Sequence, residues 1–299
     1  MDKILPAIRS MLIDHLAANQ PLSANVAVGD TVLHVQNTSH FRPGDEVFLM
    51  SLTTNLAEPV TITKINDWDE LIVDPPASNA WTMANSSMVQ KCIGWIPLKR
   101  VHIGDLRLNP DFPMVTIEPT SESNDWITLQ ATTHEHRLAI RVYVQQDNFE
   151  STNLLLAKYA KQIREILIDH IHPLVDYVQY ALLSDLLVGQ TVATISSTSL
   201  FQPNTVVFLR DAKPRPNAQE DLVKAILGPT QLELATPAKY DYLTARQAQL
   251  FLVNRYFYDT RVSDITYGFV PGQGGSLLKG AEINMYLKEE ILRQGNIVT

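Results

Sequence analysis

Val28-Gly29-Asp30-Thr31-Val32 opens a stretch that occurs twice in this chain and decides its fold. It leads through Thr38-Ser39-His40-Phe41-Arg42-Pro43 to Val47-Phe48-Leu49. The second copy begins at Val188-Gly189-Gln190-Thr191-Val192, 160 residues further along. Its other parts are Thr198-Ser199-Leu200-Phe201-Gln202-Pro203, Val207-Phe208-Leu209 and, at an offset of 161, Leu232-Glu233-Leu234 for Leu71-Ile72-Val73. Because chance seldom keeps register over so many positions, the chain contains an internal duplication.

Each copy has the pattern of a small all-β unit. Thr31, Leu33 and Val35 alternate with other residues, which predicts a short strand with one more apolar face. A turn of Asn, Ser and Pro follows, and Val47-Phe48-Leu49 then predicts a buried strand. We expect two antiparallel units of about five short strands each. The first covers residues 24–92 and the second covers residues 186–254.

Similar helical segments precede the two units, at residues 8–16 and 163–171. Leu5, Ile8 and Leu12 lie on one stripe of the first helix, at three- and four-residue spacing. The second helix starts near Ser151-Thr152-Asn153, which suits an N-cap, and ends at His172-Pro173.

Outside the two units remain residues 1–23, 93–185 and 255–299, which we expect to form one core domain. Apolar alternation in these pieces predicts strands at residues 114–118, 126–130, 137–144, 262–268 and 281–287, and it is clearest at 137–144. We therefore predict an α+β fold class. It would be an antiparallel sheet with helices packed on one face, interrupted by two duplicated all-β units.

Composition excludes several classes of protein. The 299 residues are 45% hydrophobic and 19% charged, which is typical of a globular protein and not of a disordered one. The formal net charge of -8 disfavours nucleic acid as a partner. No apolar run is long enough to span a bilayer, and Met1-Asp2-Lys3 leads into an amphipathic pattern unlike a signal peptide. We expect synthesis in a host cytoplasm and no membrane partner.

Candidate chemistry is sparse. His134-Glu135-His136 places two imidazoles on one face of a strand, but the sequence specifies no third metal ligand beside them. Cys92 is the one cysteine, and its apolar neighbours predict a buried thiol. The chain contains no Gly-x-Ser-x-Gly and no His-Glu-x-x-His motif. We therefore predict no catalytic, cofactor-binding or metal-binding residues, no cofactor, and a protein that is not an enzyme.

One loop is a candidate interface. Pro271, Gly272, Gln273, Gly274 and Gly275 hold too many glycines for regular structure, and no Lys-Ser/Thr follows them as in a phosphate-binding loop. We expect a mobile loop at a subunit interface or at the lumen of a tube.

The order of the core motifs resembles a known family. A short N-terminal helix precedes a Pro-x-Val-x-Ile strand, a Trp strand and His134-Glu135-His136-Arg137-Leu138-Ala139-Ile140-Arg141-Val142-Tyr143-Val144. A Leu- and Ala-rich helix follows, and the chain closes with Leu277-Leu278-Lys279-Gly280-Ala281-Glu282-Ile283. This order resembles the tail terminator (tail completion) proteins of long-tailed bacteriophages, over about half of the chain.

The resemblance implies a structural protein of the virion, located at the tail and neck. In that family the domain forms a six-membered ring that caps the finished tail tube and receives neck or head-completion proteins. The implied partners are further copies of the chain, the tube protein and a neck protein. Contact with a tail sheath stays open.

Two other functions remain open at this stage. The chain could instead be another neck or baseplate adaptor on a related fold. Alternatively, the duplicated β units are typical of a carbohydrate-binding receptor module with repeated sites.

Overall fold

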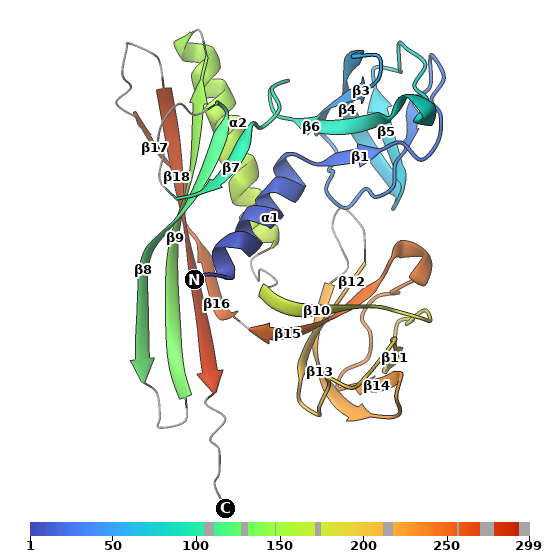
Figure 1. Ribbon diagram of the computed structural model, residues 1–299, viewed down its shortest axis with the longest axis vertical. Helices are drawn as coiled ribbons and strands as arrows, with labels where there is room; N and C mark the ends of the chain where they lie inside the picture. Colours follow the sequence, from blue (N-terminus) through green and yellow to red (C-terminus); the bar gives the residue numbers. More distant parts are fainter. Residues whose placement is uncertain are drawn as a thin grey trace, which may run out of the picture.

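The computed structural model of the protein describes residues 1–104, 111–126, 131–146, 148–170, 175–211, 218–255, 257–269 and 278–292. Within these ranges, 18 strands form three sheets and two α-helices occur (Figure 1). The predicted α+β class is therefore wrong, because the molecule is mostly β. The two β units contribute twelve of those strands and no α-helix, whereas the α+β prediction rests on the core alone.

The first β unit is a six-stranded antiparallel sheet in the order β1-β6-β3-β4-β5-β2. A bridge between Leu22, just after β1, and Val35, just after β2, brings the two ends of the sheet together. The sheet thus curls around an apolar centre that includes Trp81 and Phe41. The strands are β1 (Asn19–Pro21), β2 (Val32–His34), β3 (Glu46–Ser51), β4 (Ala57–Asp67), β5 (Glu70–Asp74) and β6 (Ser87–Cys92), with a 3-10 turn, η1 (Met83–Asn85), before β6.

The second β unit repeats this topology, in the order β10-β15-β12-β13-β14-β11. The structure therefore confirms the duplication strand by strand. Tyr242 takes the place of Trp81, since each forms a backbone bridge to the start of its unit, at Leu186 and Val26. The strands are β10 (Val175–Ala181), β11 (Val192–Thr194), β12 (Val206–Arg210), β13 (Ala218–Ile226), β14 (Gln231–Leu234) and β15 (Gln249–Arg255), with η2 (Thr244–Arg246) before β15.

Even the left-handed backbone positions recur. Gly29 and Gly189 have φ of 91° and 85°, and Gly44 (φ 93°) corresponds to Asn204 (φ 68°). Asparagine is the residue that most readily replaces glycine in this region of φ, so the turn survives the exchange.

Both units begin earlier than residues 24 and 186. β1 pairs with β6, and β10 pairs with β15, so the strand that enters each unit lies beside the strand that leaves it. The strand β1 has only three residues, too few to show a period of two, so the sequence pattern does not predict it.

The core sheet has the order β16-β18-β9-β8-β7, with β17 also paired to β18. The predicted strand at 114–118 continues as far as Trp126, through an irregularity between Pro119 and Ser121. Residues 127–130 of the predicted strand at 126–130 lie outside the described ranges, so that strand stays a prediction. The predicted strand at 262–268 is two strands, β16 and β17. The bounds are β7 (Arg100–Ile103), β8 (Met114–Trp126), β9 (Ala131–Gln145), β16 (Phe257–Val262), β17 (Thr266–Phe269) and β18 (Leu278–Leu292).

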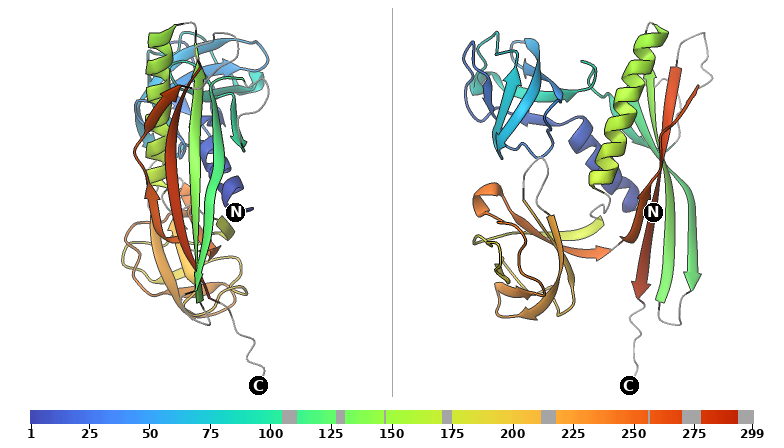
Figure 2. Two further views of the ribbon diagram at one scale, coloured as in Figure 1. Left: turned by 90° about the vertical axis from the view of Figure 1, so that its left-hand side faces the viewer. Right: turned by 180° about the vertical axis from the view of Figure 1, so that it is seen from behind.

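Two helices, α1 (Ile4–Leu16) and α2 (Phe149–Asp169), cover one face of this sheet. α1 packs over β7 and β8, and α2 packs over β9 and β18. Their apolar stripes, including Ile8, Leu12 and Ile163, are buried against Ile140 and Ile283 of the sheet. Figure 2 (left) shows that no helix covers the opposite face of the sheet, which we call the outer face.

The two β units lie side by side on the helix side of the core, away from the outer face (Figure 1). Arg246 of the second unit lies 3.8 Å from Asp67 of the first, so the two units meet. Neither described helix is both long enough and apolar enough to span a bilayer.

Candidate functional site

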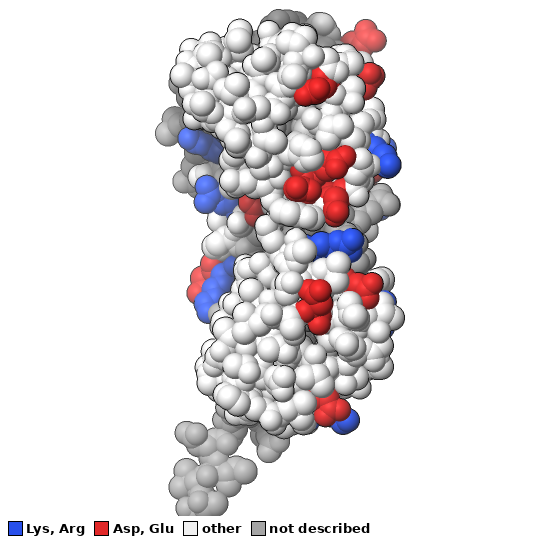
Figure 3. All heavy atoms as spheres, turned by 90° about the vertical axis from the view of Figure 1, so that its right-hand side faces the viewer, with Lys and Arg blue, Asp and Glu red and all other residues white. Residues whose placement is uncertain are grey.

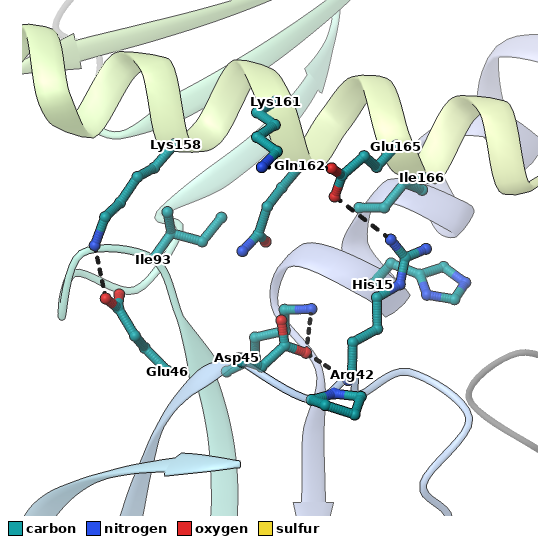
Figure 4. Close-up of a pocket in the computed structure, with 13 residues that line it drawn as sticks. His15, Arg42, Asp45, Glu46, Ile93, Lys158, Lys161, Gln162, Glu165 and Ile166 are labelled. Carbon is teal, nitrogen blue, oxygen red and sulfur yellow. Dashed lines mark hydrogen bonds and ion pairs between the residues drawn. The ribbon is translucent and has the colours of Figure 1, made fainter. Parts of the chain in front are cut away.

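A cleft of about 320 Å³ separates the first β unit from α2 (Figure 4). Unit residues 42–46 and Lys91 form one wall, and α2 forms the other through Lys158, Lys161, Gln162 and Glu165. Figure 4 shows charged side chains from both walls pointing into the space between them.

The charges in this cleft are paired across or within its walls. Lys158 Nζ lies 2.7 Å from Glu46 Oε1, and Lys91 Nζ lies 2.6 Å from Asp45 Oδ2. Arg42 reaches α2, 2.5 Å from Asp169 Oδ2, and a second carboxylate, that of Glu165, lies 3.8 Å from it. Because each of these charges has a partner, and the pairs of Lys158 and Arg42 cross from the first unit to α2, the cleft holds the unit against the helix.

The surface on which the first unit rests against α2, which we call the seat, is completed by a tight turn at residues 93–96. Gly94 and Trp95 both have φ of 60°, and Ile93 and Ile96 exchange backbone hydrogen bonds around them. A Cβ on Gly94 would lie 2.7 Å from Leu155 Cδ1 of α2. Glycine is therefore required twice, for its backbone conformation and for the close approach of the helix.

Three histidines from distant parts of the sequence meet beside the seat. His15 of α1 lies 5.0 Å from His40 of the first unit and 4.3 Å from His170 after α2, measured between ring centroids. Burial, together with nearby cations that include Arg210, lowers the pKa of His40 to about 4 and that of His170 to about 3. Burial also lowers the pKa of His15, with His170 and His40 adding to the effect.

These rings do not form a metal centre. Among the described residues, no group of three or more His, Cys, Asp or Glu side chains is arranged to hold a metal ion. With their pKa values lowered, the three imidazoles pack in the neutral form where α1, α2 and the first unit join, near Arg210 of the second unit.

The outer face of the core sheet carries an ordered set of polar side chains. Arg141 lies between two carboxylates, donating to Glu118 and Glu282 from the strands on either side. Further along, Lys288 Nζ lies 3.1 Å from Glu135. A second cleft, of about 470 Å³, opens on this face around Arg137 and Tyr286.

The residues predicted from sequence have different outcomes. Pro271, Gly272, Gln273, Gly274 and Gly275 lie outside the described residues, so the interface loop stays a prediction. Cys92 is buried as predicted, and burial raises the pKa of its thiol to about 12.

Of the two histidines His134 and His136, the second lies in a buried polar contact. His136 is fully buried, with Nε2 2.9 Å from Glu289 and Nδ1 3.5 Å from Glu122. This histidine is part of a buried pair between β9 and β18, and no sequence spacing points to its partner, which lies 153 residues away.

Comparisons with known proteins add little. No protein-family model matches the chain, and no curated protein matches it significantly. Over 26% of its length the chain is similar to the Gp54 tailspike of Acinetobacter baumannii bacteriophage AP22, solved in complex with capsular saccharide, at 16% sequence identity and a TM-score of 0.25. The match spans 15% of that tailspike. At this TM-score the likeness carries no argument about this chain.

Proposed function

We propose that the chain is a structural subunit of a long-tailed phage tail, which forms a ring at the head-side end of the tail tube. The order of core motifs in the sequence supports this assignment, and the proposal does not depend on the fold class. It involves no catalytic step.

The observation that carries the proposal is the open edge of the core sheet. β7 pairs with β8 only as far as Ile117, so the rest of β8, up to Trp126, pairs with β9 on one side alone among the described strands. An unpaired strand edge is a template for another chain. β16 and β17 lie at the opposite edge of the same sheet.

A sheet with exposed edges on both sides suits head-to-tail assembly. Such a contact joins two different surfaces of identical subunits, and it closes into a ring when the rotation between subunits permits. One modest contact repeated around a ring gives a stable, defined end to a tube. In this proposal the β units reach outward to neck or sheath proteins, and the loop at 271–275 contacts the tube.

The test is deletion of the gene from its phage, followed by electron microscopy of the lysate. We expect filled heads beside unattached tails of irregular length, and rescue when the full chain is supplied from a plasmid. Normal particles without the gene would refute the proposal and would direct work to glycan arrays.

An adaptor role elsewhere in the neck or baseplate is the nearest alternative. Gold labelling of a tagged chain in intact particles separates the two, because a terminator labels the head-proximal end of the tail only.

A further inference from the structure

A row of side chains crosses the outer face of the core sheet in register. Arg261 of β16 lies opposite Tyr286 of β18, which lies opposite Arg137 of β9. Both guanidinium groups approach the tyrosine ring, with the Arg137 and Arg261 Cζ atoms 5.9 and 5.8 Å from its centroid. The tyrosine hydroxyl bonds to Glu135, which fixes the ring between the two arginines.

The two arginines differ in what neutralises them. Arg261 is held by Asp259 through two hydrogen bonds of 2.8 and 3.1 Å. Arg137 forms no direct ion pair with a described carboxylate, although its charge adds to the hydrogen bonds of Tyr286 and Lys288 in lowering the pKa of the Glu135 carboxyl, and its guanidinium is stacked on the Tyr286 ring. An oriented guanidinium that no carboxylate holds in a direct ion pair can still donate hydrogen bonds to an anionic group.

The surroundings agree with this reading. The described residues that line the second cleft include Arg137 and Arg261 and no Asp or Glu. Neutral hydrogen-bonding groups of Thr120, Ser263 and Asn284 surround the pair. The cleft is therefore basic on a chain whose net charge is -8.

Acidic side chains gather on the opposite side of the molecule. Figure 3 views the β units from the side away from the core sheet and shows groups of Asp and Glu on both units. Among the residues whose burial is described, the exposed acidic ones of the two units are Asp30, Asp67, Asp74, Asp185, Glu220 and Asp241, of which Asp67 lies 3.8 Å from Arg246. Two copies placed in the same orientation thus bring a basic cleft towards an acidic surface.

We propose that the Arg137–Tyr286–Arg261 cleft binds an exposed acidic segment of the β units of a second copy of this chain. The inference goes beyond the proposed ring, because this contact joins the outer face of one copy to the β units of another and is separate from the sheet-edge contact of the ring. Copies with a charge of -8 repel one another in general, and a basic surface that faces an acidic one offsets part of this repulsion. Arginine and tyrosine are also the residues that most often dominate the binding energy of an interface.

The test places a photo-crosslinking amino acid at Thr120, which is exposed and lines the cleft, so that both arginines stay intact. The variant is supplied to phage-infected cells that lack the native gene. We expect a light-dependent dimer of the chain, whose crosslinked peptide comes from an acidic segment of a β unit. The control probe at Leu154, exposed on α2, should not give this product.

Charge reversal then tests the arginines. Arg137→Glu with Arg261→Glu should reduce the dimer at least tenfold, because it places like charges in contact. Arg100→Glu, an equal change per site in β7 of the same sheet, should alter it less than twofold. Reversing the charge of the acidic residue identified by the crosslink should restore the dimer with the reversed cleft.

A crosslink to a different protein, no dimer in cells that form particles, or a dimer that survives the double reversal would overturn the inference. Deletion of the gene tests where the protein acts in the phage tail, while the crosslink from Thr120 tests which surfaces of two copies are in contact. Each proposal can therefore fail without the other.

Discussion

Lys91 and Asp45 form an ion pair of 2.6 Å inside the first β unit, with side chains only 3% and 6% exposed. Lys91 lies opposite Val47, and the equivalent residue in the second unit, Leu252, lies opposite Val207. Asp45 corresponds to Thr205, and each accepts a hydrogen bond from the backbone N–H three residues earlier. The two copies share one topology, but at this position the first unit has a buried ion pair and the second unit has an apolar contact.

This relationship predicts the result of a double-mutant cycle. Lys91→Leu alone leaves Asp45 buried without its counter-ion and should destabilise the protein by about 3 kcal/mol or more. Lys91→Leu with Asp45→Thr copies the second unit and should recover most of that loss, as measured by thermal unfolding. If the double variant is no more stable than the single one, the two positions are not equivalent.

The glycine at the seat should tolerate no side chain. Gly94→Ala adds left-handed strain of about 1–2 kcal/mol and a contact of 2.7 Å with Leu155, so its total cost should exceed the strain alone. Gly44 is the matched control, because it also has a positive φ but has open space around it. Gly44→Asn should cost less than about 1 kcal/mol, since Asn204 occupies the equivalent place. Equal losses in the two variants would contradict the role of Leu155.

Acid should loosen the junction of the three histidines. The folded protein holds the pKa values of His15, His40 and His170 below 6.5, so the neutral form is favoured in the fold. Their stabilising contribution is therefore complete above pH 6.5 and is lost as pH falls towards 4 and 3. For His40 alone the loss by pH 4 amounts to roughly 3 kcal/mol.

The measurement is the melting temperature between pH 7.5 and pH 5, where most carboxylates stay ionised. His15→Gln removes the ring that touches both others, so its melting temperature should fall less steeply with acid. Parallel curves for the variant and the native chain would contradict the prediction. Arg42, Lys91, Arg210, Asp45, Glu165 and Asp169 surround this junction, and the comparison with the variant cancels their common contribution.

The seat should also depend on Arg42. Its guanidinium contacts Glu165 and Asp169 of α2, whereas the second unit has Gln202 at this position. Arg42→Gln should weaken docking of the unit by about 1 kcal/mol and leave the unit itself folded. Hydrogen exchange at the facing surface of the two parts should quicken, and Lys224→Gln, which breaks a pair within the second unit, should not have that effect.

The duplication and most core strands were predictable from the sequence, because both depend on local alternation and on an offset that a single chain displays. The first part of β8 was predicted to end at residue 118 because Pro119 and the polar run after it interrupt the alternation, while the backbone ladder continues through a bulge to Trp126. The class was wrong for a different reason, since it was named from the core domain, whereas the two predicted β units contribute most of the strands.

The candidate sites were not predictable. His15, His40 and His170 come from three separate elements, and Arg137, Tyr286 and Arg261 come from three strands that are neighbours only in the folded sheet. No spacing of residues in the sequence indicates that the three histidines, or the two arginines and the tyrosine, come together in the fold. The loop at 271–275 was found by composition, and its place in the assembly is still a prediction.

The pairing of β1 with β6, and of β10 with β15, has a consequence for how such a protein can change. The chain enters and leaves each β unit on adjacent strands, roughly 5 Å apart across a ladder. A unit is therefore a cassette with both ends at one point of the host domain, and it can be gained, lost or exchanged without rerouting the rest of the chain. The two copies have already diverged where they touch their host and have kept the same connectivity inside.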